Sequence, residues 1–177
     1  MGQTLASYAI RLLESEPRLS AALEVPLLVW ADAEVLAEED QDRVFQTRGG
    51  GALDRPQAGE PVVFELRKQT TKVNPFLMGI TVGRNDNNDI VLDDPSISRF
   101  HAYFQQDARS GGWKLVDAES RNGTWVAPLK LAGNISQPVG DRGLIRFGDL
   151  TMRFLLPGTF LEYLKLQMES SGPVEIR

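Results

Sequence analysis

Gly83-Arg84, Ser98-Arg99-Phe100-His101-Ala102 and Ser120-Arg121-Asn122-Gly123-Thr124 are three polar clusters that share one stretch of the chain. The runs between them are short, rich in β-branched and aromatic residues, and bounded by turn formers, a pattern typical of strands. In an antiparallel arrangement alternate connections lie at the same end of a sheet. We therefore expect the clusters to meet in space as one surface built from loops.

The side chains of this surface suit an oxygen-rich anion. They offer guanidinium groups, hydroxyl groups and a side-chain amide, which are the donors that a dianion such as phosphate accepts from. The residues are Arg84, Arg99, Arg121, Ser98, Ser120 and Asn122.

The order of the motifs resembles the forkhead-associated (FHA) domain family. The resemblance also includes Asn88-Asp89-Ile90-Val91-Leu92, Gly140-Asp141 and Phe147-Gly148, and it covers roughly Pro61 to Leu156. Several spaced motifs in the right order are far more specific than one short motif. The resemblance implies an antiparallel β-sandwich whose apical loops bind phosphothreonine peptides.

The resemblance implies a role for each motif residue. It places Arg84 and Ser98 on the phosphate, whereas an isolated surface Arg84 would pair with Asp86 or Asp94. It places Asn122 on the main chain of the peptide, because an amide offers a donor and an acceptor together. Asn122 also suits a turn before Gly123.

Arg99 and Arg121 carry weaker expectations. Arg121 stands where many family members have a hydroxyl residue, so its guanidinium either replaces that contact or points to solvent. Arg99 either contacts the phosphate or supports the site. The supporting residues are expected to be Gly83, His101, Gly123 and Thr124.

His101 is the only histidine of the sequence, and cysteine is absent. No Gly-x-Ser-x-Gly motif accompanies it, and a zinc site would need further nitrogen or sulfur ligands. We therefore predict no catalytic residue, no metal and no cofactor. Asn85 to Asp89 is interpreted as turn chemistry, since a calcium loop starting at Asp86 would put isoleucines at ligand positions.

The composition is that of a soluble globular protein, with 177 residues and an apolar fraction of 42%. The net charge of −5 argues against non-specific nucleic-acid binding. The absence of cysteine suits a reducing compartment, and neither a secretory signal nor a membrane-spanning run is evident. We expect a cytoplasmic protein without membrane insertion.

The residues before the sandwich predict a helical extension. Apolar residues recur at helical spacing from Thr4 to Glu14, with Thr4 as the cap, and a second short helix follows Pro17. Pro26 to Ala31 fits a strand or a helix, and Trp30 would either dock the extension or face a partner. The acidic run Ala33 to Asp42 is interpreted as a solvated helix face, with a surface for a basic partner as the alternative.

Composition divides the chain into four parts. They are a helical extension (1–46), a Gly/Pro-rich linker (47–60), the sandwich (61–157) and a C-terminal helix and tail (158–177). Thr159 followed by Glu162 predicts a capping box for the last helix. The predicted strands are Val62–Lys68, Phe76–Val82, Ile90–Leu92, Phe100–Gln105, Trp113–Asp117, Thr124–Val126, Leu144–Phe147 and Thr151–Leu156, with Trp113, Trp125 and Phe147 in the core.

The leading hypothesis is a phosphothreonine-dependent signalling adaptor that acts downstream of a Ser/Thr kinase. Its partner would be a Thr-phosphorylated protein or peptide. The alternative is a scaffold that binds a partner independently of phosphate through the N-terminal helices and Trp30. Deleting residues 1–58 is expected to spare a phosphate reader and to inactivate such a scaffold.

Overall fold

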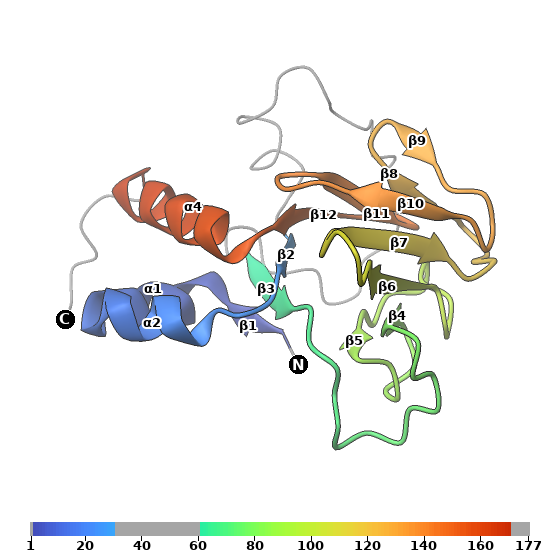
Figure 1. Cartoon of the computed structure of the whole chain (residues 1–177), viewed down its shortest axis with the longest axis horizontal. Coiled ribbons are helices and arrows are strands. Elements are labelled where there is room, and N and C mark those ends of the chain that lie inside the picture. Colours follow the sequence, from blue (N-terminus) through green and yellow to red (C-terminus); the bar gives the residue numbers. More distant parts are fainter. Residues whose placement is uncertain (1, 31–60, 171–177) are drawn as a thin grey trace.

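The computed structural model describes residues 2–30 and 61–170, which form two packed sheets and three helices (Figure 1). The seven-stranded sheet has the order β1-β3-β2-β12-β11-β8-β9, and the five-stranded sheet has the order β10-β7-β6-β4-β5. Only β4 and β5 pair in parallel among these described strands. The predicted mainly antiparallel β-sandwich is thus confirmed.

The strands of the seven-stranded sheet are β1 (Gln3–Thr4), β2 (Leu27–Trp30), β3 (Val62–Glu65), β8 (Thr124–Val126), β9 (Leu129–Lys130), β11 (Leu144–Phe147) and β12 (Leu150–Leu155). Those of the five-stranded sheet are β4 (Ile80–Gly83), β5 (Ile90–Val91), β6 (Ala102–Gln106), β7 (Trp113–Asp117) and β10 (Ser136–Val139).

The main core lies between the two sheets. Alternate residues of each strand point into it, as the two-residue period of a strand requires. Phe104, Phe147 and Phe154 fill its centre, and the Phe104 ring meets Phe147 edge-to-face and stacks with Phe154. Burying each ring stabilises the fold by roughly 1.5 to 3 kcal/mol.

The helices cover the outer face of the seven-stranded sheet at its β1-β3-β2-β12 end. They are α1 (Leu5–Glu14), α2 (Glu16–Ala22) and α4 (Pro157–Ser170), and Figure 1 shows them grouped on one side of the sandwich. Their apolar faces build a second core with strand residues such as Val29 and Leu155. Tyr8 and Phe160 meet edge-to-face there, at 5.1 Å between ring centroids.

The N-terminal helices follow the predicted pattern. The Thr4 side chain caps α1 by accepting from the Ser7 N–H, and Pro17 lies in the first turn of α2. Pro at this position lacks only an N–H that the first turn leaves unbonded in any case. The periodicity of the apolar residues therefore located both helices.

The segment that the sequence left open between strand and helix is strand β2. It lies between β3 and β12, and its two faces belong to different cores, with Leu28 in the main core and Leu27 in the helical one. Trp30 packs against the main core. Deleting residues 1–58 would thus remove an internal strand, so the expected survival of the sandwich after this deletion does not stand. The division into domains stays a prediction.

A long loop, residues 66–79, replaces the ends of two predicted strands. β3 ends at Glu65 and β4 begins at Ile80. The buried carboxylate of Asp89 anchors the loop by accepting from Lys68 Nζ (2.9 Å) and the Gln69 N–H (2.9 Å). Burial alone would raise the pKa of Asp89, but the bonds from Thr81, Gln69 and Lys68 outweigh it and hold this pKa below its ordinary value.

Three further expectations are corrected. β10 is absent from the predicted strands, because Gln137 and Pro138 give it no strand-like alternation. α4 begins at Pro157, and the Thr159 hydroxyl bonds to Asp141 Oδ2, so Thr159 is not the cap. Trp125 lies outside the core with its ring stacked on Arg146, at 3.4 Å from the guanidinium carbon to the ring centroid.

The helix expected over Ala33–Asp42, the linker 47–60 and the tail beyond Ser170 lie outside the described residues. In the parts that the structure describes, no helix is long and apolar enough to cross a membrane.

Candidate functional site

The three polar clusters lie together because four strand ends meet at one end of the sandwich. β4 and β7 finish there, and β6 and β8 begin there. Two hydrogen bonds join the connecting loops directly. The Arg84 N–H donates to the Ser98 carbonyl (2.9 Å), and the Arg121 N–H donates to the Ser98 side-chain Oγ (3.0 Å). The loop surface predicted from the sequence is therefore present.

Gly83 is required at the end of β4 by close contact with the neighbouring loop. A Cβ placed there would lie 2.4 Å from the Arg99 carbonyl oxygen. The same oxygen accepts from Asn88 Nδ2 (2.7 Å) and from the Asn85 N–H (3.2 Å). These contacts fix the main chain of Arg99 and therefore the position from which its side chain extends.

His101 joins two of the loops from a fully buried position. Its Nδ1 accepts from the Ser98 N–H (3.0 Å), so the ring proton lies on Nε2, which donates to the Gly123 carbonyl (3.1 Å). Burial lowers the pKa of His101, and the Gly123 bond and the Asp117 charge oppose this shift without reversing it. The ring is therefore neutral and structural.

Asp117 organises the third loop. Its carboxylate accepts from the Ser120 N–H (3.0 Å), from Ser120 Oγ (2.6 Å) and from Thr124 Oγ1 (2.6 Å). The Ser120 hydroxyl proton is thus used inside the loop, and this residue is not the free donor that its sequence position suggested. Thr124 is fully buried and supports the loop from below.

Gly123 completes the turn in a left-handed conformation, with φ of +89°. Its N–H donates to Ser120 Oγ (3.0 Å), and its carbonyl also accepts from the Gly148 N–H (3.0 Å). Asn122 Nδ2 donates to the Ser96 carbonyl (2.7 Å). This bond uses one of the two Nδ2 protons and does not involve the Oδ1 of Asn122.

The guanidinium groups of Arg84, Arg99 and Arg121 are on exposed residues. Arg84 Nε donates to the Ile97 carbonyl (3.3 Å), which orients the side chain and leaves its two terminal nitrogens available. Within residues 2–30 and 61–170, no carboxylate forms an ion pair with any of the three. Pairing of Arg84 with Asp86 or Asp94 is therefore not seen.

Sequence reasoning missed two supporting residues, Asp117 and Ser96. Asp117 ends a buried strand three residues before Ser120, a spacing at which a carboxylate accepts from a following N–H. Ser96 supplies its carbonyl to Asn122 and its Oγ to the Asp149 N–H (3.1 Å), a partner too distant in sequence for a local signal. In the described residues, no group of three or more acidic or histidine side chains could hold a metal ion.

Comparison with known proteins gives one family match: residues 80–148 fit the model of the FHA domain. The chain is 37% identical to the oxoglutarate dehydrogenase inhibitor of Corynebacterium glutamicum over 75 residues, which is 42% of this chain and 49% of the relative. It is 34% identical to the FHA domain-containing protein PS1 of Arabidopsis thaliana over 77 residues, which is 44% of this chain and 5% of the relative. The chain thus spans less than half the length of either relative.

Among solved structures, the N-terminal FHA domain of S. cerevisiae RAD53p in complex with a phosphothreonine peptide is 26% identical. The match covers 47% of this chain and 71% of that chain, with a TM-score of 0.41. The family match spans β4 to β11 and contains every loop that builds the candidate site. Residues 80–148 are thus the part of this chain that matches the FHA domain family model.

Proposed function

We propose that the chain is a phosphothreonine-dependent binding module that serves as a signalling adaptor downstream of a Ser/Thr kinase. The observation that carries the proposal is the meeting of three exposed arginines with Ser98 and Asn122 on loops that are already fixed by hydrogen bonds. A preformed site loses little conformational entropy on binding.

Each residue has a defined task in the proposed complex. The terminal nitrogens of Arg84 donate to two phosphate oxygens, in the forked geometry that suits guanidinium and phosphate. Ser98 Oγ already accepts from Arg121, so its own proton is free to donate to the phosphate. Asn122 offers Oδ1 and one N–H proton to the peptide main chain.

Arg99 and Arg121 add charge around the phosphate. A phosphothreonine carries about −1.5 to −2 charges at pH 7, whereas an unmodified threonine is neutral. The unmodified peptide would leave the three guanidinium groups without a counter-charge, so the site distinguishes the two forms mainly by electrostatics. The partner is thus a Thr-phosphorylated protein, with a Ser/Thr kinase supplying the signal.

The proposal assigns binding and not catalysis. His101, the residue that would first suggest a hydrolase, is buried and spends both ring nitrogens on main-chain bonds. We further propose a cytoplasmic location and no role for nucleic acid, in line with the acidic chain and its lack of cysteine.

A phosphate-independent scaffold is the second candidate. Ile10 and Leu13 of α1 are 58% and 69% exposed, which leaves apolar surface on the helices for a partner. The I10S/L13S double variant separates the candidates, because a helix-mediated partner would be lost while phosphopeptide binding would persist.

Arg84→Ala tests the leading proposal. The side chain is exposed, so the variant is expected to fold normally and to lose at least tenfold in affinity for a phosphothreonine peptide, measured by fluorescence anisotropy. Arg109→Ala, on an exposed residue of the β6–β7 turn, is the matched control and should bind as the parent does. Equal binding of phosphorylated and unphosphorylated peptide by the parent protein would overturn the proposal.

A further inference from the structure

An apolar strip lies on the outer side of β4 and β6, next to the candidate site. It consists of Phe76, Leu77, Met78, Phe100 and Tyr103. The Phe76 ring contacts the rings of Tyr103 and Phe100 at centroid distances of 4.6 and 5.4 Å. Leu77 is 85% exposed, Met78 70% and Phe100 39%, so the strip presents three large apolar side chains to solvent.

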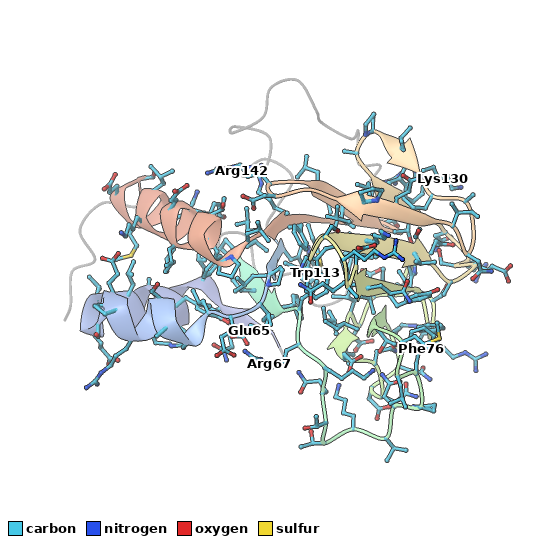
Figure 2. The ribbon with its side chains drawn as sticks, viewed as in Figure 1. Glu65, Arg67, Phe76, Trp113, Lys130 and Arg142 are labelled. Carbon is cyan, nitrogen blue, oxygen red and sulfur yellow. The ribbon has the colours of Figure 1, made fainter. Side chains whose placement is uncertain are left out.

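The loop that carries Phe76, Leu77 and Met78 is held in place. Lys68 Nζ donates to the Phe76 carbonyl (2.7 Å), and the Phe76 N–H donates to Asn74 Oδ1 (3.0 Å). Gln105 Nε2 donates to the Met78 carbonyl (3.1 Å) from β6. Figure 2 shows Phe76 on the side of β4 and β6, far from the three helices. The exposure of these side chains is therefore a fixed feature of the surface.

The aromatic end of the strip lies next to the candidate site. Phe100 directly follows Arg99 and lies two residues before β6 begins, at the end of the strand where the site lies. At the other end of the strip, the Met78 carbonyl accepts from Gln105 Nε2. Gln105 lies in β6, five residues after Phe100. At about 3.3 Å per residue the strip extends roughly 16 Å from the site, which an extended peptide covers in about five residues.

We propose that this strip is a second contact for the same phosphorylated partner and holds an apolar side chain within about five residues of the phosphothreonine. The inference rests on the proposed function of the neighbouring loops. Phosphate binding fixes the register of the peptide, and the strip adds selectivity for a leucine, methionine or aromatic residue. Met78 suits this task because its flexible thioether adapts to side chains of different shape.

Two other occupants fit less well. Three exposed side chains bury far less than the roughly 800 Å² per partner of a stable dimer, which disfavours a second copy of this chain. Leu129 and Ile135 are also exposed, at 58% and 54%, but they belong to β9 and to the segment before β10, not to the segments that form the strip. They serve as the matched control surface.

The test uses the full chain and a set of phosphothreonine peptides whose flanking residues are polar apart from a single leucine. The set places this leucine in turn at every position from five residues before to five residues after the phosphothreonine. The all-polar phosphopeptide and its unphosphorylated form are measured alongside. At one or more positions leucine is expected to tighten binding about tenfold, which corresponds to burial of roughly 50 Å² of apolar surface. The L77S/M78S variant should lose this gain and bind the all-polar phosphopeptide as the parent does.

The outcomes separate the two proposals. Binding of the all-polar phosphopeptide, together with absence of binding by its unphosphorylated form, supports the phosphate site by itself. If leucine then adds nothing at any position, or if its gain survives in L77S/M78S, the strip proposal is overturned while the phosphate site stands. The control L129S/I135S is expected to keep the gain, and loss of the gain in this variant would also overturn the strip proposal. Dimerisation that depends on Leu77 and Met78 in analytical ultracentrifugation would also overturn it.

Discussion

His101 is a buried residue whose charge state determines whether two loops of the site stay joined. Its ring is neutral in the fold, accepts from Ser98 and donates to Gly123. Because the pKa of His101 is lowered in the folded state, the unfolded chain takes up its proton more readily, with a pKa of about 6.5. The stability that this residue contributes is thus complete above about pH 6.5 and decreases as the pH falls below it.

Replacing His101 by leucine should test that contribution. The variant leaves the Ser98 N–H and the Gly123 carbonyl without their partner, so we expect a loss of about 2 to 4 kcal/mol in the free energy of unfolding at pH 7.5. Urea titrations between pH 7.5 and 5.5 should show falling stability in the parent and a flatter profile in the variant. If the free energy of unfolding changes equally with pH in both proteins, groups other than His101 cause the pH dependence.

Gly83 tests how closely the loops approach. Gly83→Ala places a methyl group 2.4 Å from the Arg99 carbonyl oxygen, and neither main chain can yield without disturbing the site. We expect about 1 to 3 kcal/mol of destabilisation and weaker phosphopeptide binding. Gly140→Ala is the matched control, since a Cβ there meets no atom within 4 Å, and thermal unfolding of both variants provides the comparison.

At the scale of elements, β2 makes the N-terminal segment a structural part of the sandwich. Leu28 is fully buried between the sheets, so Leu28→Ala is expected to lower the unfolding free energy by about 2 to 5 kcal/mol. Leu13→Ala removes a similar side chain from the exposed face of α1 and should change it by about 0.5 kcal/mol or less. Similar values for the two variants in chemical denaturation would argue against an internal β2.

These elements also show which features the sequence could predict. α1 was evident because its apolar residues recur at helical spacing after a capping Thr4, and β6 and β7 because apolar and β-branched residues cluster between turns. β2 was ambiguous because both of its faces are buried, which removes the alternation that distinguishes a strand from a buried helix. β10 was missed because Gln137 and Pro138 break the alternation that marks a strand.

In the candidate site, too, some residues could be predicted from the sequence and others could not. The meeting of Arg84, Ser98 and Asn122 could be predicted because the spacing of their motifs is visible in the sequence. The support from Asp117 and Ser96 could not, since it depends on which loops meet and on which main-chain groups then need partners. The role of Ser120 was misjudged for the same reason.

For the whole molecule, binding is expected to depend on both salt and pH. The chain has a net charge of −5, so the arginines of the site attract a phosphorylated partner while the excess of acidic residues elsewhere in the chain repels it. Raising the ionic strength from about 0.05 to 0.5 M should weaken phosphopeptide binding severalfold by screening. Isothermal titration calorimetry at several salt concentrations measures this effect, and a leucine-dependent gain at the apolar strip should be nearly unaffected.

The pH dependence of binding has a second origin in the ligand. The phosphate loses its second proton with a pKa near 6, so affinity should rise from pH 5.5 to 7.5 as the dianion forms. The control is a peptide in which a phosphonate or a glutamate, whose acidic group has a different pKa, replaces the phosphothreonine. If the charge of the ligand causes the rise in affinity with pH, this rise should shift or disappear with the control peptide. An unchanged profile would point to His101 and the stability of the loops.

Arg99 and Arg121 join the loops of the site through their main-chain atoms. The Arg99 carbonyl accepts from Asn88 and Asn85, and the Arg121 N–H donates to Ser98. Neither arginine side chain takes part in these bonds, so residues 99 and 121 can vary without altering the path of the chain. A library randomised at these two positions should therefore remain folded while sampling different charges and shapes beside the phosphate, which makes the domain a scaffold for engineered phosphopeptide readers.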